Sequence, residues 1–330
     1  MKKIQYAIAR KETGNASGKA KKDAFDIALK MGFVPSYHPV AVQFLRVLLQ
    51  IVSLPRFVGK KVIFFQYPAV SELLMNMFRK IVSKKSYKIA LIHDLSSIQG
   101  LAEYERNREV EFLSIFDCLI VHNQCMDDYV KRIGYKGKTV ILGLFDYLHD
   151  ANHEIQEHSF SNSVSFAGNL EKAVFLKNIG TINCNWILYG KKGENSFENF
   201  SNVSYKGLLP SDEIQYLMEG DYGLVWDGDS IDTCAGPSGE YLRFNNPHKL
   251  SCCIAAGKPV ITWRKAAIAS FVEKKQIGIT VDSLKDLNNI DLSNNYETMR
   301  RNVMKIKKEI SDGKFLESAI LKALKLGNIV

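Results

Sequence analysis

The chain alternates short apolar runs with helical patterns, and this alternation limits the folds open to it more than any other feature. Five runs in the first half are predicted to be buried strands, at 4–9, 61–67, 87–94, 118–123 and 138–142. Five more lie in the second half, at 164–168, 185–190, 222–228, 258–263 and 277–281. Continuous apolar strands separated by helices are typical of parallel sheets covered on both faces. The sequence therefore predicts an α/β protein with two doubly wound, Rossmann-like sheets in tandem.

A polar stretch at 149–163 has little that could build a core, and it marks the predicted domain boundary. A chain of 330 residues also favours two domains over one. We place an N-terminal domain at 1–152 and a second Rossmann-like domain at 153–311. The amphipathic, lysine-rich residues 312–330 are expected to form a helix that returns toward the N-terminal domain. Ligands of such sheets bind at the carboxyl ends of the strands.

Composition and charge indicate the class of protein, its compartment and the kind of partner that it binds. Hydrophobic residues make up 46% and charged residues 24%, as in globular proteins. The start of the chain lacks the pattern of a secretion signal, and the six cysteines lack framework spacing, so a reducing cytoplasm is expected. Residues 1–88 hold 17 Lys and Arg against 4 Asp and Glu, although the whole chain is only +9. This basic quarter predicts an anionic partner such as a membrane surface or a phosphorylated substrate.

The apolar stretch at 38–61 lies within this basic quarter and is too short and too interrupted to span a bilayer. It either belongs to the core of the N-terminal domain or lies in a membrane interface with its flanking lysines on lipid phosphates. Nucleic acid is not expected, because the lysines are not interleaved with an aromatic platform and no DNA-binding motif is present. Homo-oligomerisation is left open.

The stretch "KETGNASGKAKKDAF" at 11–25 resembles a phosphate-binding loop but fails the Walker pattern. Only three residues separate Gly14 from Gly18, and Ala20 replaces the hydroxyl that would hold magnesium after Lys19. A nucleotide triphosphatase is therefore not expected. A flexible turn before a helix and a different kind of phosphate site both remain open.

Two strand ends in the second half carry phosphate-binding features. "FAGNLEK" places Gly168 and Asn169 directly after a strand, with Lys172 in the turn that follows, although an ordinary strand-to-helix turn would have the same residues. In "RFNNPHKL" we expect Asn245 or Asn246 to cap a helix with Pro247 at its first position, which places Lys249 in the first turn. A lysine there opposes the helix dipole unless an anion compensates, so the helix start is interpreted as a diphosphate site.

Two further groups are candidates for chemistry. "LIHD" places His93 and Asp94 at a strand end; Asp94 is preferred as the catalytic base and His93 is the alternative, while Asp94 could instead only position its loop. Glu103, Glu105 and Glu109 lie downstream and could substitute as the base if their loop folds inward. Asp227 and Asp229 in "WDGDS" could bind a divalent metal, but we favour sugar contacts and no required metal, because Lys249 would supply the same positive charge.

The motifs "LIHDL", "GDYGLVWDGDS" and "FNNPHKLSCCIAAGKPVI" resemble those of bacterial galactofuranosyltransferases of O-antigen and lipopolysaccharide assembly. They also resemble those of streptococcal glucosyltransferases that act on serine-rich adhesins. The resemblance covers nearly the whole chain and is stronger to the galactofuranosyl group, which shares "WDGDS", "FNNPHK" and a start similar to "KAKKDAF". The glucosyl relatives differ from this chain at "DGDS" and at "FNNPHK".

The resemblance implies a GT-B fold, two facing Rossmann-like domains that bind a UDP-sugar without a metal or other cofactor. The implied donor-binding residues are Asn15, Ala16, Ser17, Gly18, Lys19, Gly168, Asn169, Lys172, Tyr189, Gly190, Trp226, Asp227, Asp229, Asn246, His248, Lys249 and Leu250. Among these, the first loop and Lys19 would close over the phosphates, and Tyr189 and Gly190 would border the uracil.

The expected activity is transfer of galactofuranose from its UDP donor to a lipid-linked glycan at the cytoplasmic face of the inner membrane, with inversion and without a metal. One alternative is a UDP-glucose-dependent enzyme that acts on a glycoprotein glycan. A dehydrogenase is disfavoured because no G-x-G-x-x-G follows the first strand. A catalytically silent subunit with an inherited fold stays open.

Overall fold

The structure is a computed structural model that describes residues 1–6, 16–37, 43–68, 72–99, 103–150, 153, 159–195, 197 and 199–329. The chain divides into two compact units. The first contains residues 1–146 and 313–330, and the second contains residues 147–312. The chain therefore passes between the units twice, next to Asp146 and next to Gly313.

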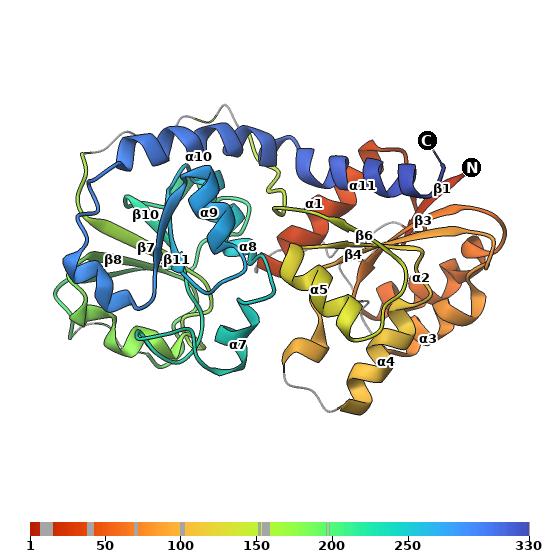
Figure 1. The fold of residues 1–330 in the computed structure, drawn as a ribbon, viewed down its shortest axis with the longest axis horizontal. Helices are drawn as coiled ribbons and strands as arrows, with labels where there is room; N and C mark the ends of the chain where they lie inside the picture. The colour runs from red at the N-terminus through yellow and green to blue at the C-terminus, as the bar shows by residue number, and fades with distance from the viewer. Residues whose placement is uncertain are drawn as a thin grey trace. The chain divides into compact units, whose positions relative to one another are not determined.

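Each unit is built on a parallel sheet that has six strands in the described residues (Figure 1). In pairing order, the first sheet consists of β2 (Val34–Pro35), β1 (Lys3–Tyr6), β3 (Val62–Tyr67), β4 (Tyr87–Ile92), β5 (Cys118–Val121) and β6 (Lys138–Ile141). The second consists of β12 (Gly278–Val281), β11 (Val260–Trp263), β10 (Tyr222–Val225), β7 (Ser163–Ala167), β8 (Asn185–Tyr189) and β9 (Val203–Gly207). The prediction of two doubly wound sheets is confirmed.

Helices connect the strands of both sheets. Those of the first unit are α1 (Ala16–Lys30), α2 (Gln43–Ser53), α3 (Glu72–Ile81), α4 (Glu103–Leu113), α5 (Gln124–Arg132) and α11 (Lys314–Leu326), with 3-10 helices η1 (Leu54–Phe57) and η2 (Ser96–Gln99). Those of the second are α6 (Ile214–Leu217), α7 (Gly236–Tyr241), α8 (His248–Ala255), α9 (Ala269–Lys275) and α10 (Tyr296–Ser311), with η3 (Val174–Thr181) and η4 (Leu284–Asn289). No helix of the described ranges combines the length and apolarity that a membrane span requires.

The two strands that the sequence did not predict, β2 and β9, both lie at the edge of a sheet. The β2 strand has only two residues, and β9 has no fully buried residue. Apolar runs arise where both faces of a strand are covered, as in the buried β3 and β5. An edge strand that faces water lacks this signal.

The last helix, α11, belongs to the first unit and packs against α1, β5 and β6 (Figure 1). Its first turn is held by Asp146, whose Oδ1 accepts a hydrogen bond from Phe315 N at 3.1 Å and whose Oδ2 accepts one from Leu316 N at 2.7 Å. A distant carboxylate thus satisfies amide groups that a helix start leaves without intrahelical partners. This contact fastens the end of the chain where it returns from the second unit.

Replacing Asp146 with Asn is expected to change how stability depends on pH. Burial is the main cause that raises the pKa of Asp146 to about 7, and the charges of Asp23 and Glu317 add to it, against the lowering effect of the two amide groups. Since the folded protein holds this proton more tightly than the unfolded chain, the contribution to stability is present near pH 4 and is lost as the pH rises through about 7. Urea unfolding should therefore show the wild type losing roughly 2–4 kcal/mol more than Asp146→Asn between pH 4 and pH 8. Equal losses in the two proteins would contradict the burial of a titrating carboxyl group.

Candidate active site

The second sheet reverses its winding direction between β7 and β10, and the candidate donor-binding residues gather at its carboxyl edge there. The β7 strand pairs with β10 on one side and with β8 on the other. Gly168 follows β7, Gly190 follows β8 and Asp227 follows β10 by two residues. Ligands of doubly wound sheets bind at such a switch point, because the helices diverge there.

Lys249 joins the ends of β7 and β10 at this point. Its Nζ donates to Asp227 Oδ2 at 2.7 Å and to the carbonyl oxygen of Trp226 at 3.3 Å. The ammonium group also lies 4.9 Å from the centre of the Phe166 ring, and an added Cβ at Gly168 would come within 3.2 Å of Lys249 Cε. Lys249 is thus held over the strand ends with its side chain 19% exposed. A fixed, partly exposed cation is well suited to neutralise a phosphate.

The anion expected beside Lys249 is present, but it belongs to the protein. Lys249 lies in the first turn of α8, as predicted, and the Asp227 carboxylate offsets the unfavourable interaction between its charge and the helix dipole. The position of the lysine therefore does not by itself require a bound phosphate. The Asp227 carboxylate holds the Lys249 ammonium group in place but is itself one-third exposed. An incoming anion could therefore compete with Asp227 for the ammonium group.

The start of α8 differs from the prediction by one residue. The helix begins at His248, and Pro247 occupies the cap position with φ −68° and ψ 138°. The prediction that an asparagine caps this helix with Pro247 at its first position is therefore wrong: the extended backbone of Pro247 delays the helix, and Asn246 is buried before it. Leu250 is fully buried and its N–H donates to the Pro247 carbonyl oxygen at 2.9 Å. Leu250 is thus a core residue, which leaves no exposed side chain there to meet a diphosphate.

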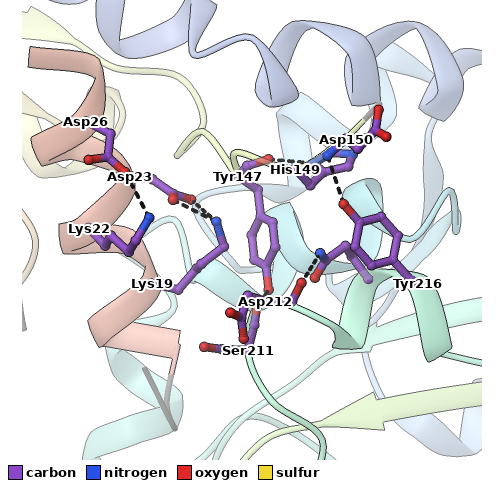
Figure 2. Close-up of polar contacts among 11 residues, drawn as sticks. Lys19, Lys22, Asp23, Asp26, Tyr147, His149, Asp150, Ser211, Asp212 and Tyr216 are labelled. Atoms are coloured by element: carbon purple, nitrogen blue, oxygen red, sulfur yellow. Dashed lines mark hydrogen bonds and ion pairs between the residues drawn. The ribbon is translucent and has the colours of Figure 1, made fainter. Parts of the chain in front are cut away.

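His248 is held by an aromatic contact within the second unit. Its ring stacks on Tyr147, with centroids 5.0 Å apart and an interplanar angle of 25°. The Tyr147 hydroxyl donates to the Ser211 carbonyl oxygen at 2.5 Å (Figure 2). The imidazole beside Lys249 is therefore oriented by packing as well as by its position in the helix.

Gly190 must be glycine at the end of β8. Its φ is +139°, and an added Cβ would lie 1.8 Å from the Gly168 carbonyl oxygen. Tyr189, by contrast, is buried, and its hydroxyl accepts a hydrogen bond from Glu219 N at 3.0 Å. Its ring is part of the core and is not presented to a ligand, which corrects the expectation that it borders the uracil. Of the predicted pair, Gly190 remains at the strand end.

The segment after β10 also mixes core and edge residues. Trp226 is fully buried and its Nε1 donates to the Ser230 carbonyl oxygen at 3.0 Å, so only its main chain reaches the lysine. Asp229 is exposed, and its Oδ2 lies where an added Cβ at Gly236 would approach within 2.6 Å. Gly236 begins the short helix α7. The Asp229 carboxylate therefore lies against the start of α7.

Asn169 and Lys172 lie in the turn after β7. Both are exposed, and the Lys172 N–H contacts Asn169 Oδ1 and the Asn169 carbonyl oxygen, each at 3.3 Å. The element that follows is the 3-10 helix η3, which begins only at Val174. The turn leaves the Lys172 ammonium group in solvent on the same edge of the sheet as Gly168.

In the first unit, His93 follows β4 at the carboxyl edge of the sheet. Gln66 Nε2 donates to the Lys21 carbonyl oxygen at 3.2 Å, which fixes the orientation of the amide. Gln66 Oε1 then accepts from His93 Nε2, 2.8 Å away, so Nε2 carries a proton. The imidazole is buried and stacks on Phe145 at 5.5 Å. Gln66 could not be identified from the sequence, because a single polar residue inside a buried strand belongs to no motif.

Asp94 lies half-buried next to His93, at the start of a turn that Glu109 holds. Glu109 Oε1 accepts from Ser96 N at 3.0 Å and from the Tyr67 hydroxyl at 2.8 Å, and Oε2 accepts from Ser97 N at 3.1 Å. Glu109 is itself buried, so it is not placed to act as a substitute base. Its contacts instead fix the backbone directly after Asp94.

The predicted phosphate loop lies largely outside the described residues. Asn15 is not described, and Ala16 and Ser17 are described only as the start of α1. Gly18 is buried, and Lys19 Nζ contacts both Asp23 carboxylate oxygens at 2.7 Å (Figure 2). Lys19 is 4% exposed, so its charge is already compensated within α1, and its role toward phosphate stays a prediction.

Cys118 and His122, at the two ends of the β5 segment, are both buried. His122 Nε2 donates to the Ile92 carbonyl oxygen at 2.9 Å, and burial lowers the pKa of His122 to about 4. Burial also raises the pKa of the Cys118 thiol to about 11. Among the residues that the structure describes, no three His, Cys, Asp or Glu side chains form a group that could hold a metal ion.

Comparison with known proteins places the whole chain in one family. Residues 4–144 match the N-terminal domain of glucosyltransferase 3-like proteins, and residues 164–323 match the C-terminal domain. The β-1,6-galactofuranosyltransferase WbbI of Escherichia coli K12 is 30% identical over 93% of both chains. The chain belongs to the glucosyltransferase 3-like family. This glucosyltransferase 3-like protein is therefore a glycosyltransferase.

The enzyme is also similar to a second sequence relative and to a solved structure. Glucosyltransferase 3 of Streptococcus gordonii is 26% identical over 72% of this chain and 70% of its own length. The crystal structure of Anabaena HepE in complex with UDP has a TM-score of 0.63, covers 98% of this chain and 99% of its own, and is 14% identical. The structural likeness shows the fold, so the predicted GT-B architecture is confirmed.

Proposed function

We propose that this enzyme transfers galactofuranose from UDP-galactofuranose to a lipid-linked glycan during assembly of a cell-surface polysaccharide. The observation that carries the proposal is the 30% identity to a β-1,6-galactofuranosyltransferase over 93% of both chains. The "WDGDS" and "FNNPHK" motifs, on which the resemblance to galactofuranosyltransferases rests, support it, because they contribute Asp227 and Lys249, which meet at the switch point of the second sheet. The HepE crystal structure, with the same fold, holds UDP.

The proposed chemistry needs a stabilised leaving group. In the transfer, the bond between the sugar C1 and the phosphate oxygen breaks, and negative charge develops on UDP. Lys249, with the main-chain N–H groups at the start of α8, would stabilise that charge without a divalent ion. Asp227 would exchange its contact with Lys249 for a contact with the sugar, the role that we favour for it from the sequence.

The acceptor must lose a proton as its oxygen forms the new bond to C1. We assign this proton transfer to Asp94, with attack from the face opposite the phosphate and therefore with inversion. Glu109 and its contacts to Ser96 and Ser97 would keep the Asp94 backbone in place. His93, whose Nε2 proton is committed to Gln66, is the alternative base through its other nitrogen.

A donor assay tests the proposal. Purified protein is incubated with UDP-galactofuranose or UDP-glucose and an acceptor glycan, and released UDP is measured with and without EDTA. We expect release from UDP-galactofuranose that EDTA does not reduce. Loss of activity with EDTA would refute the metal-independent reaction, and turnover of neither donor would refute the donor assignment.

A second candidate is a UDP-glucose-dependent enzyme that extends a glycan on a protein. It is favoured by the match to glucosyltransferase 3 of Streptococcus gordonii and by the family models. Competition between the two donors in the same assay discriminates the candidates. The lipid-linked acceptor of the first candidate would place the enzyme at the cytoplasmic face of the inner membrane. Self-association stays a separate question, which light scattering answers.

A further inference from the structure

Helix α2 exposes its apolar side chains and buries a polar one. Phe44, Leu45, Leu48, Ile51 and Val52 are all exposed, with Phe44 at 79% and Val52 at 65%. Their spacing places them on one face of the helix. On its inner side, Gln50 is fully buried, and its Nε2 donates to the Tyr37 hydroxyl at 2.9 Å. An ordinary surface helix shows the opposite arrangement, with its apolar stripe toward the core.

The exposed apolar surface continues beyond α2 toward a group of lysines. Val58 is exposed directly after η1, and Lys60 follows two residues later. Ser86 joins this turn to the one before β4, because its Oγ donates to the Gly59 carbonyl oxygen at 2.8 Å and accepts from Lys61 N at 3.1 Å. The turn before β4 carries exposed Lys84 and Lys85, so two lysine-bearing turns lie side by side.

These turns lie at the amino edge of the first sheet. Lys3 pairs with Val62, and Val62 pairs with Tyr87, so the lysines at the start of β1, β3 and β4 lie on adjacent strands. Residues 1–6, 43–68 and 80–88 contain no Asp or Glu. The acidic residue that precedes β5, Asp117, is bound to Lys88 at 2.9 Å. Much of the basic charge predicted to bind an anion thus lies on the edge opposite His93 and Asp94.

We propose that the exposed face of α2, Val58 and the two lysine turns form a docking surface for an anionic lipid bilayer. Apolar side chains would enter the headgroup boundary while the lysines contact lipid phosphates. A second copy of this chain is the less favourable occupant, because an isologous contact would bring the same lysines together. The proposal rests on the proposed function for its purpose, since a lipid-linked acceptor lies at a membrane.

Vesicle sedimentation tests the surface with the full-length protein and without any sugar donor. Vesicles of phosphatidylcholine alone are compared with vesicles that also contain phosphatidylglycerol. We expect the wild type to bind the anionic vesicles, more weakly at high salt, and to bind the neutral vesicles much less. The double variant Phe44→Ser/Val52→Ser should bind at least about tenfold more weakly, because both side chains would leave the bilayer.

Matched control variants distinguish binding through this surface from nonspecific binding through other exposed apolar or basic residues. Leu208 and Leu217 are similarly exposed in the second unit, and Leu208→Ser/Leu217→Ser should bind like the wild type. Lys60→Glu/Lys85→Glu should abolish binding to anionic vesicles, whereas Lys274→Glu/Lys275→Glu, on α9, should retain most of it.

Three outcomes would overturn the proposal. The first is that the wild type does not bind anionic vesicles, and the second is that Phe44→Ser/Val52→Ser binds them as the wild type does. The third is that the wild type forms an oligomer and does not bind vesicles, whereas Phe44→Ser/Val52→Ser is a monomer. Activity on a water-soluble acceptor glycan, measured in parallel, is independent of docking. A protein that is active but does not bind vesicles would therefore refute only the membrane surface. A protein that binds vesicles but is inactive would refute only the proposed reaction.

Discussion

Lys249→Ala is expected to lower kcat/KM for the UDP-sugar by about 10²–10³-fold, because it removes the cation proposed to stabilise the departing diphosphate. Calorimetry should show a matching loss of affinity for UDP. The fold should persist, since the Lys249–Asp227 pair is partly exposed, with side chains 19% and 32% accessible, and such pairs contribute at most about 1 kcal/mol. Lys249→Arg keeps the positive charge but changes the shape of the charged group. Its kcat/KM should therefore lie between that of the wild type and that of Lys249→Ala.

The contact with Asp227 offers another explanation for the same loss, and a double-mutant cycle separates the two. If Lys249 only holds Asp227 in position, then Asp227→Asn should be as damaging as Lys249→Ala, and the double variant should be no worse. If Lys249 binds the diphosphate, only its own replacement should remove most of the UDP affinity. Lys274→Ala, an exposed lysine in the same unit, is the matched control for loss of charge. Full activity of Lys249→Ala would refute the phosphate site.

Asp94→Asn should reduce kcat by about 10²–10⁴-fold, as expected when a positioned general base is removed. UDP affinity should stay near that of the wild type, because Asp94 is assigned to the acceptor and not to the donor. This split between turnover and nucleotide binding distinguishes Asp94→Asn from Lys249→Ala. The measurement is initial-rate kinetics for both substrates, combined with UDP calorimetry on the same preparations.

Two variants test the competing roles near Asp94. Glu109→Gln weakens the contacts that hold Ser96 and Ser97, so it should lower thermal stability and turnover together. If Asp94 serves only to position its turn, Asp94→Asn should reproduce that combined loss. His93→Gln should be the more damaging change if His93 is the base. A large loss in His93→Gln with near-normal turnover in Asp94→Asn would exchange the two assignments.

The candidate donor site shows how far residue patterns reach. The placement of Gly168 and Gly190 after strands, and of Lys249 in the first turn of a helix, followed from apolar runs and turn residues along the chain. Which neighbouring side chains face a ligand did not follow. Tyr189 and Leu250 both lie in the core, because a side chain at a strand end or helix start can pack inward without changing the local pattern.

Contacts between distant residues were also out of reach. Lys249 and Asp227 are separated by 22 positions, and only the adjacent packing of α8 and β10 brings them to 2.7 Å. The same holds for Asp146, which holds the start of α11 from about 170 residues away. Ion pairs and caps of this kind depend on the arrangement of elements, which no local spacing encodes.

The sequence alone determined the two doubly wound sheets, the basic character of the first quarter and the family to which the chain is similar. These properties follow from apolar periodicity, composition and motifs, each of which is read along the chain. Only the tertiary structure decided that α2 turns its apolar face outward and that lysines gather at the amino edge of the first sheet. Burial and strand pairing set these features, and both depend on residues that are distant in the chain.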